Sequence, residues 1–139
     1  MNAKNVLVSA FFISLLGCAT TPVPTDSARE VSSTKIINST FLEYKDGLGQ
    51  VIIKRDKGLS ASACNSRVYA NGSPVADIAP GEKVTFYLPE GQQMLAAKSA
   101  GICIGGLVET VALVHRTTPA VFRISYGSSG EFSIHPTAF

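Results

Sequence analysis

The feature that most constrains the fold of this chain is a series of short runs in which apolar residues occupy every second position. The runs KVTFYL, from Lys83 to Leu88, and AVFRISY, from Ala120 to Tyr126, show this alternation clearly. Successive side chains of a strand point to opposite faces of a sheet, so each such run predicts a strand with one buried face. We predict eight strands in all: Val51 to Lys54, Ser66 to Ala70, Val75 to Ile78, Lys83 to Leu88, Gln92 to Lys98, Leu107 to His115, Ala120 to Tyr126 and Phe132 to His135.

Turn residues separate these runs at spacings of about ten residues, which is typical of all-β domains. Asn71-Gly72 joins two of the runs, and both residues accept the positive φ that a two-residue hairpin turn requires. The segment LVETVALV is ambiguous because apolar residues recur in it at both two- and four-residue spacing, but its valines and its threonine favour a strand. The sequence therefore predicts an antiparallel β-sandwich or a small barrel.

The amino-terminal segment has the features of a signal peptide. Lys4 supplies a positive charge, and an apolar run from Val6 to Leu16 follows it. That run is too short to cross a bilayer as a helix, which needs about 20 residues. We therefore expect residues 1–17 to be a signal peptide that is removed during export.

The sequence Leu15-Leu16-Gly17-Cys18 resembles the lipobox of bacterial lipoproteins, with an apolar residue three positions before the cysteine and a small residue directly before it. The resemblance implies cleavage before Cys18 and attachment of acyl chains there, so that the lipid bilayer is a partner of the chain. No aspartate follows Cys18 at the position associated with retention in the inner membrane. By the same resemblance, the destination is the outer membrane, on its periplasmic face. The alternative is an ordinary secretory signal followed by a coincidental cysteine.

Between the signal peptide and the first expected strand lies a stretch rich in Thr, Ser and Pro. It has few residues to bury, and such a stretch cannot offset the entropy lost on ordering. We expect residues 18–34 to form the lipidated cysteine and a flexible tether, which Pro22 and Pro24 stiffen. Residues 35–139 then form a single β-sandwich domain.

Two cysteines, Cys64 and Cys103, remain after Cys18 is lipidated. In an oxidising compartment, a disulfide between them is the expected state. A redox pair would more often have the spacing Cys-x-x-Cys, and a zinc site would need further ligands. Between these alternatives, the residues favour a structural disulfide.

The charge balance, 12 Lys and Arg against 10 Asp and Glu, argues against a nucleic-acid partner, which requires a clustered basic surface. The single basic run is Lys54-Arg55-Asp56-Lys57, which is broken by its own aspartate. We expect it to be a solvated strand end and turn. The alternative is a weak contact with anionic lipid headgroups.

The sequence offers no group of residues that we interpret as a catalytic, metal or cofactor site. His115 and His135 lie at the ends of expected strands without a second ligand at metal-binding spacing. The segment Gly127 to Gly130 (GSSG) is not a nucleophile elbow, because it joins two expected strands. The segment Gly101 to Gly106 (GICIGG) lacks the lysine and hydroxyl of a phosphate loop. We interpret that segment as a flexible connection held by the disulfide, with an apolar partner-binding loop and a ligand-binding loop as alternatives.

The segment SRVYANGSPVADIAPGEKVTFYLPEG, from Ser66 to Gly91, resembles PEGA-like β modules and small bacterial lipoproteins of uncharacterised function. The shared pattern is a strand, an Asn-Gly turn, a short strand, a turn around glycine, and a strand that ends in Pro-x-Gly. The resemblance covers about a fifth of the chain and implies a β-sandwich in the cell envelope. It brings no catalytic residues with it.

These observations favour a non-enzymatic envelope lipoprotein that binds another envelope protein, peptidoglycan or a polysaccharide. A second hypothesis is a periplasmic hydrolase in which folding brings His115 or His135 near an acid. A third is a protective or exclusion lipoprotein that blocks a surface receptor. A convergent histidine, acid and nucleophile would favour the enzyme, whereas an exposed apolar patch would favour binding.

Overall fold

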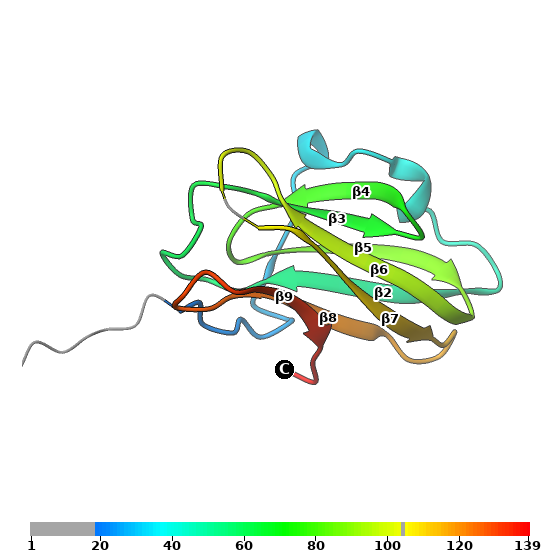
Figure 1. The fold of residues 1–139 in the computed structure, drawn as a ribbon. Coiled ribbons are helices and arrows are strands. Elements are labelled where there is room, and N and C mark those ends of the chain that lie inside the picture. Colours follow the sequence, from blue (N-terminus) through cyan, green and yellow to red (C-terminus); the bar gives the residue numbers. More distant parts are fainter. Residues whose placement is uncertain (1–18, 104) are drawn as a thin grey trace, which may run out of the picture.

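The structure is a computed structural model that describes residues 19–103 and 105–139, and it is a sandwich of two β-sheets (Figure 1). One sheet has the strand order β1-β5-β2-β8-β9 and the other has the order β4-β3-β6-β7. Two short 3-10 helices precede β2. The elements are β1 Arg29–Glu30, η1 Ser33–Lys35, η2 Ser39–Leu42, β2 Leu48–Arg55, β3 Ser66–Ala70, β4 Ser73–Ile78, β5 Glu82–Pro89, β6 Gly91–Ser99, β7 Leu107–Val114, β8 Ala120–Tyr126 and β9 Phe132–Pro136.

All eight expected strands are present, as β2 to β9, with their ends within a few residues of the expected ones. The all-β sandwich is therefore confirmed, and the alternative of a closed barrel is not realised. Most pairings are antiparallel, but β2 pairs with β8 in parallel, and so does the two-residue β1 with β5. The sandwich is thus mainly antiparallel, as expected, and the two parallel pairs are features that the sequence did not predict. The parallel pairs join segments that are distant in sequence, which local turn signals do not reveal.

The hairpin between β3 and β4 forms around the expected Asn71-Gly72 turn. The two residues have φ of 48° and 81°, and Ala70 pairs directly with Ser73. A Cβ added at Gly72 would meet nothing within 4 Å, so glycine is needed there for its backbone conformation rather than for space. A bulge between Val68 and Tyr69 shifts the register farther along this hairpin.

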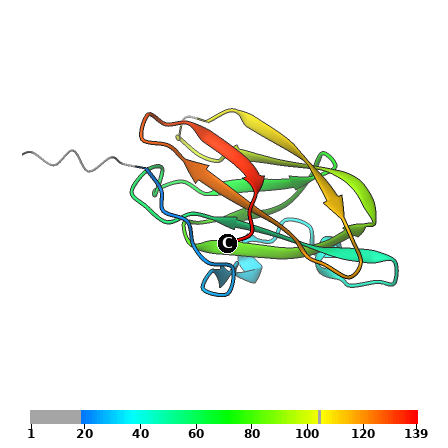
Figure 2. The same cartoon turned by 90° about the horizontal axis from the view of Figure 1, so that it is seen from below.

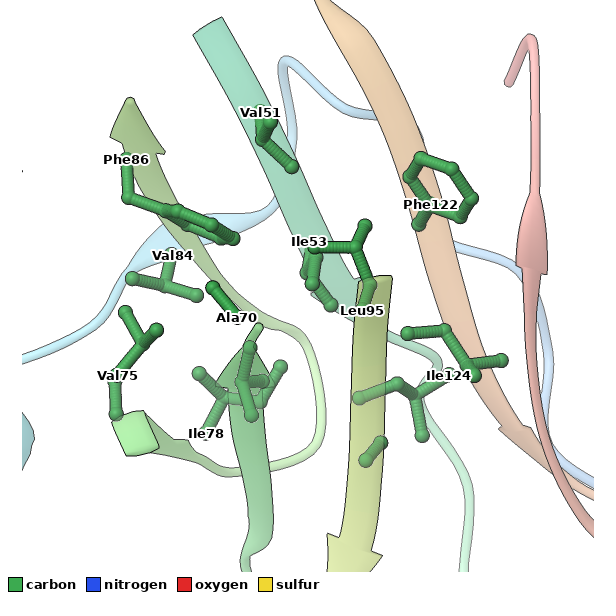
Figure 3. Packing of buried hydrophobic residues seen from close by; sticks show 14 of the residues in the cluster. Val51, Ile53, Ala70, Val75, Ile78, Val84, Phe86, Leu95, Phe122 and Ile124 are labelled. Atoms are coloured by element: carbon green, nitrogen blue, oxygen red, sulfur yellow. The ribbon is translucent and has the colours of Figure 1, made fainter. Parts of the chain in front are cut away.

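The core lies between the two sheets and is built from the alternating apolar positions (Figure 3). In β5 the every-second residues Val84, Phe86 and Leu88 are buried, as their spacing predicts. From the other sheet, Leu95 and Ile78 point toward them. Each fully buried aliphatic or aromatic side chain of this kind contributes about 1.5–3 kcal/mol relative to leaving it in water.

The expectation of a flexible tether was wrong for residues 19–34, because this segment packs along the sandwich. Thr21 forms a bridge with Lys57, and the N–H of Val31 donates to the carbonyl of Lys83 at 2.8 Å. Val23 is only 3% exposed, and Ala28 is also buried. In Figure 2 the blue segment follows the body of the domain rather than leading away from it. The domain therefore begins near Thr20, not near residue 35.

Within residues 19–103 and 105–139, no helix has both the length and the apolar character needed to cross a bilayer. In these described residues, the helical content is confined to the two single-turn elements η1 and η2.

Candidate functional site

The most distinctive surface is the free edge formed by β7, which is the last strand of its sheet (Figure 1). Among the described strands its only ladder partner is β6, which pairs with it from Gly91↔Val114 to Lys98↔Leu107. In the described part of the chain, no backbone hydrogen bond or bridge joins the other side of β7 to any segment. An edge of this kind presents unpaired N–H and C=O groups that another extended chain can use.

The outer face of β7 is also apolar. Leu107, Val111 and Leu113 are 54%, 52% and 58% exposed, and Met94 of β6, opposite Val111, is 42% exposed. The inner face of the same strand carries the buried Ala112 and Val114. We name the four exposed side chains Met94, Leu107, Val111 and Leu113 the β7 stripe. Met94, Val111 and Leu113 are neighbours on two paired strands, and Glu109 separates Val111 from Leu107 on the same face.

One shallow cavity adjoins the β7 stripe, and a second cavity shares Tyr69 and Lys98 with it. The first, of about 260 Å³, is lined by Tyr69, Gly72, Met94, Ala96, Lys98, Leu107 and Glu109. The other has the same volume and is lined by Arg67, Tyr69, Lys98, Ser99, Ala100 and Gly101. The sheet face is hollow at the first cavity because Ala96, which lies opposite Tyr69, has a small side chain. The face thus has an apolar part along β7 and a charged part nearer β3.

The charged part is ordered by an ion pair across the β3–β4 hairpin. The Arg67 guanidinium donates to both carboxylate oxygens of Asp77, at 2.8 and 2.9 Å. This bidentate contact raises the pKa of Arg67 above its usual range. Lys98 and Glu109 are the other charged residues near the cavities. In the β6–β7 ladder, Lys98 pairs with Leu107 and Glu109 pairs with Ala96.

The expected disulfide between Cys64 and Cys103 is confirmed, with a Cα–Cα distance of 6.1 Å. It joins the segment between β2 and β3 to the segment between β6 and β7. The expected lipidation site Cys18 lies outside the described residues, as does the expected signal peptide at 1–17. Of the segment Gly101 to Gly106, Ile102 is almost fully exposed, and residue 104 lies outside the described residues.

The basic run was expected to be solvated, and this expectation was wrong, because Lys54, Arg55 and Asp56 have no exposed surface. Arg55 donates to the carbonyl oxygens of Ala61 and Cys64, which replace the water it has lost. Its guanidinium also lies 4.8 Å from the centre of the Tyr126 ring.

The neighbours of Arg55 are satisfied in different ways. The Lys54 ammonium donates to Thr25 Oγ1 and to the carbonyl of Phe139, and burial lowers its pKa. The Asp56 carboxylate accepts from Arg123 at 2.6 Å, yet burial raises its pKa above the ordinary value. The run is therefore a buried structural element, and only Lys57 is exposed.

The two histidines occupy different environments. His115 is exposed in the turn after β7. His135 lies on β9 with Nδ1 3.4 Å from Ser133 Oγ, which is itself 2.8 Å from Ser125 Oγ. The nearest acid in this region, Asp56, is held by Arg123, and these side chains line neither of the two cavities. Among the described residues, no group of three or more His, Cys, Asp or Glu side chains is placed to hold a metal ion.

The sequence predicted β7 as a strand but did not identify it as an edge. The available signal was its pattern, in which apolar residues occur on both faces of LVETVALV. We interpreted that pattern only as an ambiguity between strand and helix. A strand that is apolar on both faces has a second face that the core does not cover unless another layer packs on it.

Comparison of the chain with models of protein families, with curated protein sequences and with solved structures finds no significant match.

Proposed function

We propose that this chain is a cell-envelope lipoprotein, anchored through Cys18 to the outer membrane, and that it binds an extended segment of a partner protein along β7. The observation that carries the binding part is the combination of an unpaired strand edge with the exposed β7 stripe. Strand addition uses exactly these two features, since backbone hydrogen bonds give affinity and alternate side chains give specificity.

A protein partner fits this surface better than peptidoglycan or a polysaccharide. The β7 stripe offers Leu and Val side chains, which cannot hydrogen-bond to sugar hydroxyls, and one Met, whose thioether is only a weak acceptor. The edge of β7 instead offers backbone groups at the spacing of another strand. The charges of Arg67, Lys98 and Glu109 beside the stripe supply the polar rim that protein interfaces have.

The binding part is tested by site-specific photo-crosslinking in cells that make the full chain. A photoreactive amino acid at position 111 should give a discrete adduct with another protein. The same amino acid at position 117, which is exposed in the turn after β7, is the matched control and should give none. Val111→Lys combined with a probe at position 113 should remove the adduct, because a charge in the stripe opposes burial. Equal adducts at positions 111 and 117 would contradict the proposal.

The anchor is tested separately by feeding cells a clickable palmitate. The wild-type chain should carry the label, and Cys18→Ala should not. Equal labelling of both chains would refute the anchor and leave the binding surface on β7 as a separate question.

A further inference from the structure

The first described residues of the chain lie at one end of the sandwich, and hydrogen bonds tie them closely to the domain. Thr20 donates from its N–H to the carbonyl of Tyr126 at 3.0 Å, and its Oγ1 accepts from the Tyr126 N–H at 2.9 Å. Gly58 lies directly beside this contact, since a Cβ there would be 3.0 Å from the Cα of Thr20. Two residue steps along a chain span at most about 7 Å, so Cys18 cannot be far from Thr20.

Four connecting segments lie at this end: residues 56–65 between β2 and β3, residues 100–103 and 105–106 between β6 and β7, residues 127–131 between β8 and β9, and residues 79–81 between β4 and β5. Figures 1 and 2 both place them at the end from which the amino-terminal segment enters. The N–H of Gly81 donates to the carbonyl of Arg55 at 2.9 Å, and the carbonyl of Gly81 accepts from the N–H of Arg29 at 3.0 Å. The disulfide Cys64–Cys103 joins the first two segments, and Ser60 Oγ donates to the carbonyl of Gly127 at 3.5 Å. We name this end of the sandwich the anchor end.

The anchor end is poor in charge and carries two apolar side chains that the core does not use. In its connecting segments the ionisable residues are the buried Asp56 and the exposed Lys57 and Glu131, and the exposed Arg29 of β1 lies beside Gly81. Leu59 is 84% exposed and Ile102 is 96% exposed, the two highest values among the large apolar residues described as exposed. Arg55 fixes the segment that carries Leu59, through the carbonyls of Ala61 and Cys64.

The opposite end of the sandwich has the reverse character. Its connecting segments, residues 43–47, 89–90 and 115–119, carry many more charges, several of them in exposed ion pairs. These residues are Glu43, Lys45, Asp46, Glu90 and Arg116. A charged end favours water, whereas an end with few exposed charges and two exposed apolar side chains loses less on leaving it.

We propose that the anchor end rests on the lipid bilayer, with Leu59 and Ile102 inserted among the acyl chains beside the lipidated Cys18. The inference rests on the proposed lipid anchor, which would bring this end to the bilayer because Thr20 is already bound to the domain. Acyl chains alone would only hold the domain near the surface; the two side chains fix which end faces the lipid. The exposed charges at this end, Arg29, Lys57 and Glu131, form no cluster of basic residues, which predicts that anionic headgroups are not required.

This orientation has a consequence for the β7 edge. β7 begins at Leu107, near the anchor end, and ends at Val114, near the charged end. At about 3.4 Å per residue, its eight residues rise about 25 Å from the bilayer. The edge and the β7 stripe then stand sideways to the membrane, where a partner in the same membrane reaches them.

The test uses the full chain, expressed from its precursor and purified from membranes in detergent. Its intact mass is measured first to establish acylation at Cys18. It is then reconstituted into phosphatidylcholine vesicles that contain a phosphatidylcholine with a diazirine in one acyl chain. After irradiation, lipid adducts are mapped by peptide mass spectrometry. We expect adducts in residues 57–63 and 99–103, severalfold above those in residues 43–47 and 115–119.

A double variant, Leu59→Ser with Ile102→Ser, should lose most of these adducts while staying in the vesicles through its acyl chains. Leu113→Ser removes an apolar side chain of β7 that is 58% exposed and should leave the adducts unchanged. An acylated chain with equal adducts at both ends, or with cross-links between copies through Leu59 or Ile102, overturns the inference and leaves the anchor intact. A chain without acyl mass overturns both.

Discussion

Replacing Arg55 by methionine tests the most unusual feature of the core, which is an arginine with no exposed surface and no carboxylate bonded to it. Its guanidinium donates to the carbonyl of Ala61 at 2.7 Å and to that of Cys64, and it lies over the Tyr126 ring. Methionine fills much of the same volume but cannot donate. The substitution therefore leaves carbonyl oxygens of the segment between β2 and β3 without a donor.

The expected loss follows from these contacts. A hydrogen bond to a charged group contributes about 1.5–3 kcal/mol, so two of them at the lower value give about 3 kcal/mol. A third contact, to the carbonyl of Ile78 at 3.5 Å, is at the distance limit and adds little. The lost interaction with Tyr126, about 1–2 kcal/mol, is offset by the absence of a buried charge in the variant. We expect the free energy of unfolding to fall by about 3 kcal/mol.

The measurement is thermal unfolding of the purified chain, followed by circular dichroism. For a domain of this size, a loss of 1 kcal/mol lowers Tm by about 4 °C, so Arg55→Met should lower it by about 12 °C. Arg116→Met is the control, because the Arg116 side chain is 60% exposed and its ion pair with Glu90 lies on the surface. If the two variants melt at the same temperature, Arg55 does not hold the segment in the way described.

Three further changes have defined outcomes. Replacing Cys64 and Cys103 together by serine should cost about 4 kcal/mol in denaturant unfolding without changing the far-ultraviolet spectrum, because the bridge closes a loop across a separation of 39 residues. Gly72→Val should cost about 1–3 kcal/mol in the same assay, through backbone strain at positive φ. Burial raises the pKa of the Asp56 carboxyl. Wild-type stability relative to Asp56→Asn should therefore be greatest below about pH 3.9 and fall as the pH rises through that raised pKa; a difference independent of pH between 3 and 7 would contradict this.

The strands were predictable because one physical rule controls them. In β5 and β8 every second side chain is buried, and the alternation is written into the sequence without reference to any distant residue. The turn at Asn71-Gly72 was predictable for a similar reason, since its positive φ values limit the residue types locally. The disulfide needed only the number of cysteines and the expected compartment.

The amino-terminal segment was not predictable in this way. Its buried residues Val23, Ala28 and Val31 are isolated among polar ones, and no period connects them. The segment is ordered by backbone pairing with Lys57, Lys83 and Tyr126, which lie many residues away and are positioned by the sandwich itself. Side chains of the sandwich also bind this segment, because Thr25 accepts hydrogen bonds from Lys54 at its Oγ1 and from Lys83 at its carbonyl. A polar composition therefore does not predict disorder for a segment whose backbone hydrogen bonds to strands of an already folded sheet.

The charged run misled for a related reason. A lysine, an arginine and an aspartate in sequence usually indicate solvent, because burying unpaired charge is costly. Here carbonyl oxygens of Ala61, Cys64 and Phe139 serve as partners for Arg55 and Lys54. Backbone carbonyls carry no signature in the side-chain sequence, so their arrangement around a buried cation follows from the tertiary fold alone.

The candidate binding surface depends on one property that is local in the sequence and on one that depends on the sheet topology. Only the local property could be predicted from the sequence. The apolar outer positions of β7 are local, and the sequence displays them. That β7 is the last strand of its sheet depends on β6 pairing with β3, which no short pattern encodes. Had another strand followed β7, the same residues would pair with it and the edge would be closed. The binding proposal therefore depends on topology, whereas the orientation proposed for the anchor end depends on how closely Thr20 is held to Tyr126. Because these are separate contacts, the crosslinking at position 111 and the lipid adducts at Leu59 and Ile102 can succeed or fail independently.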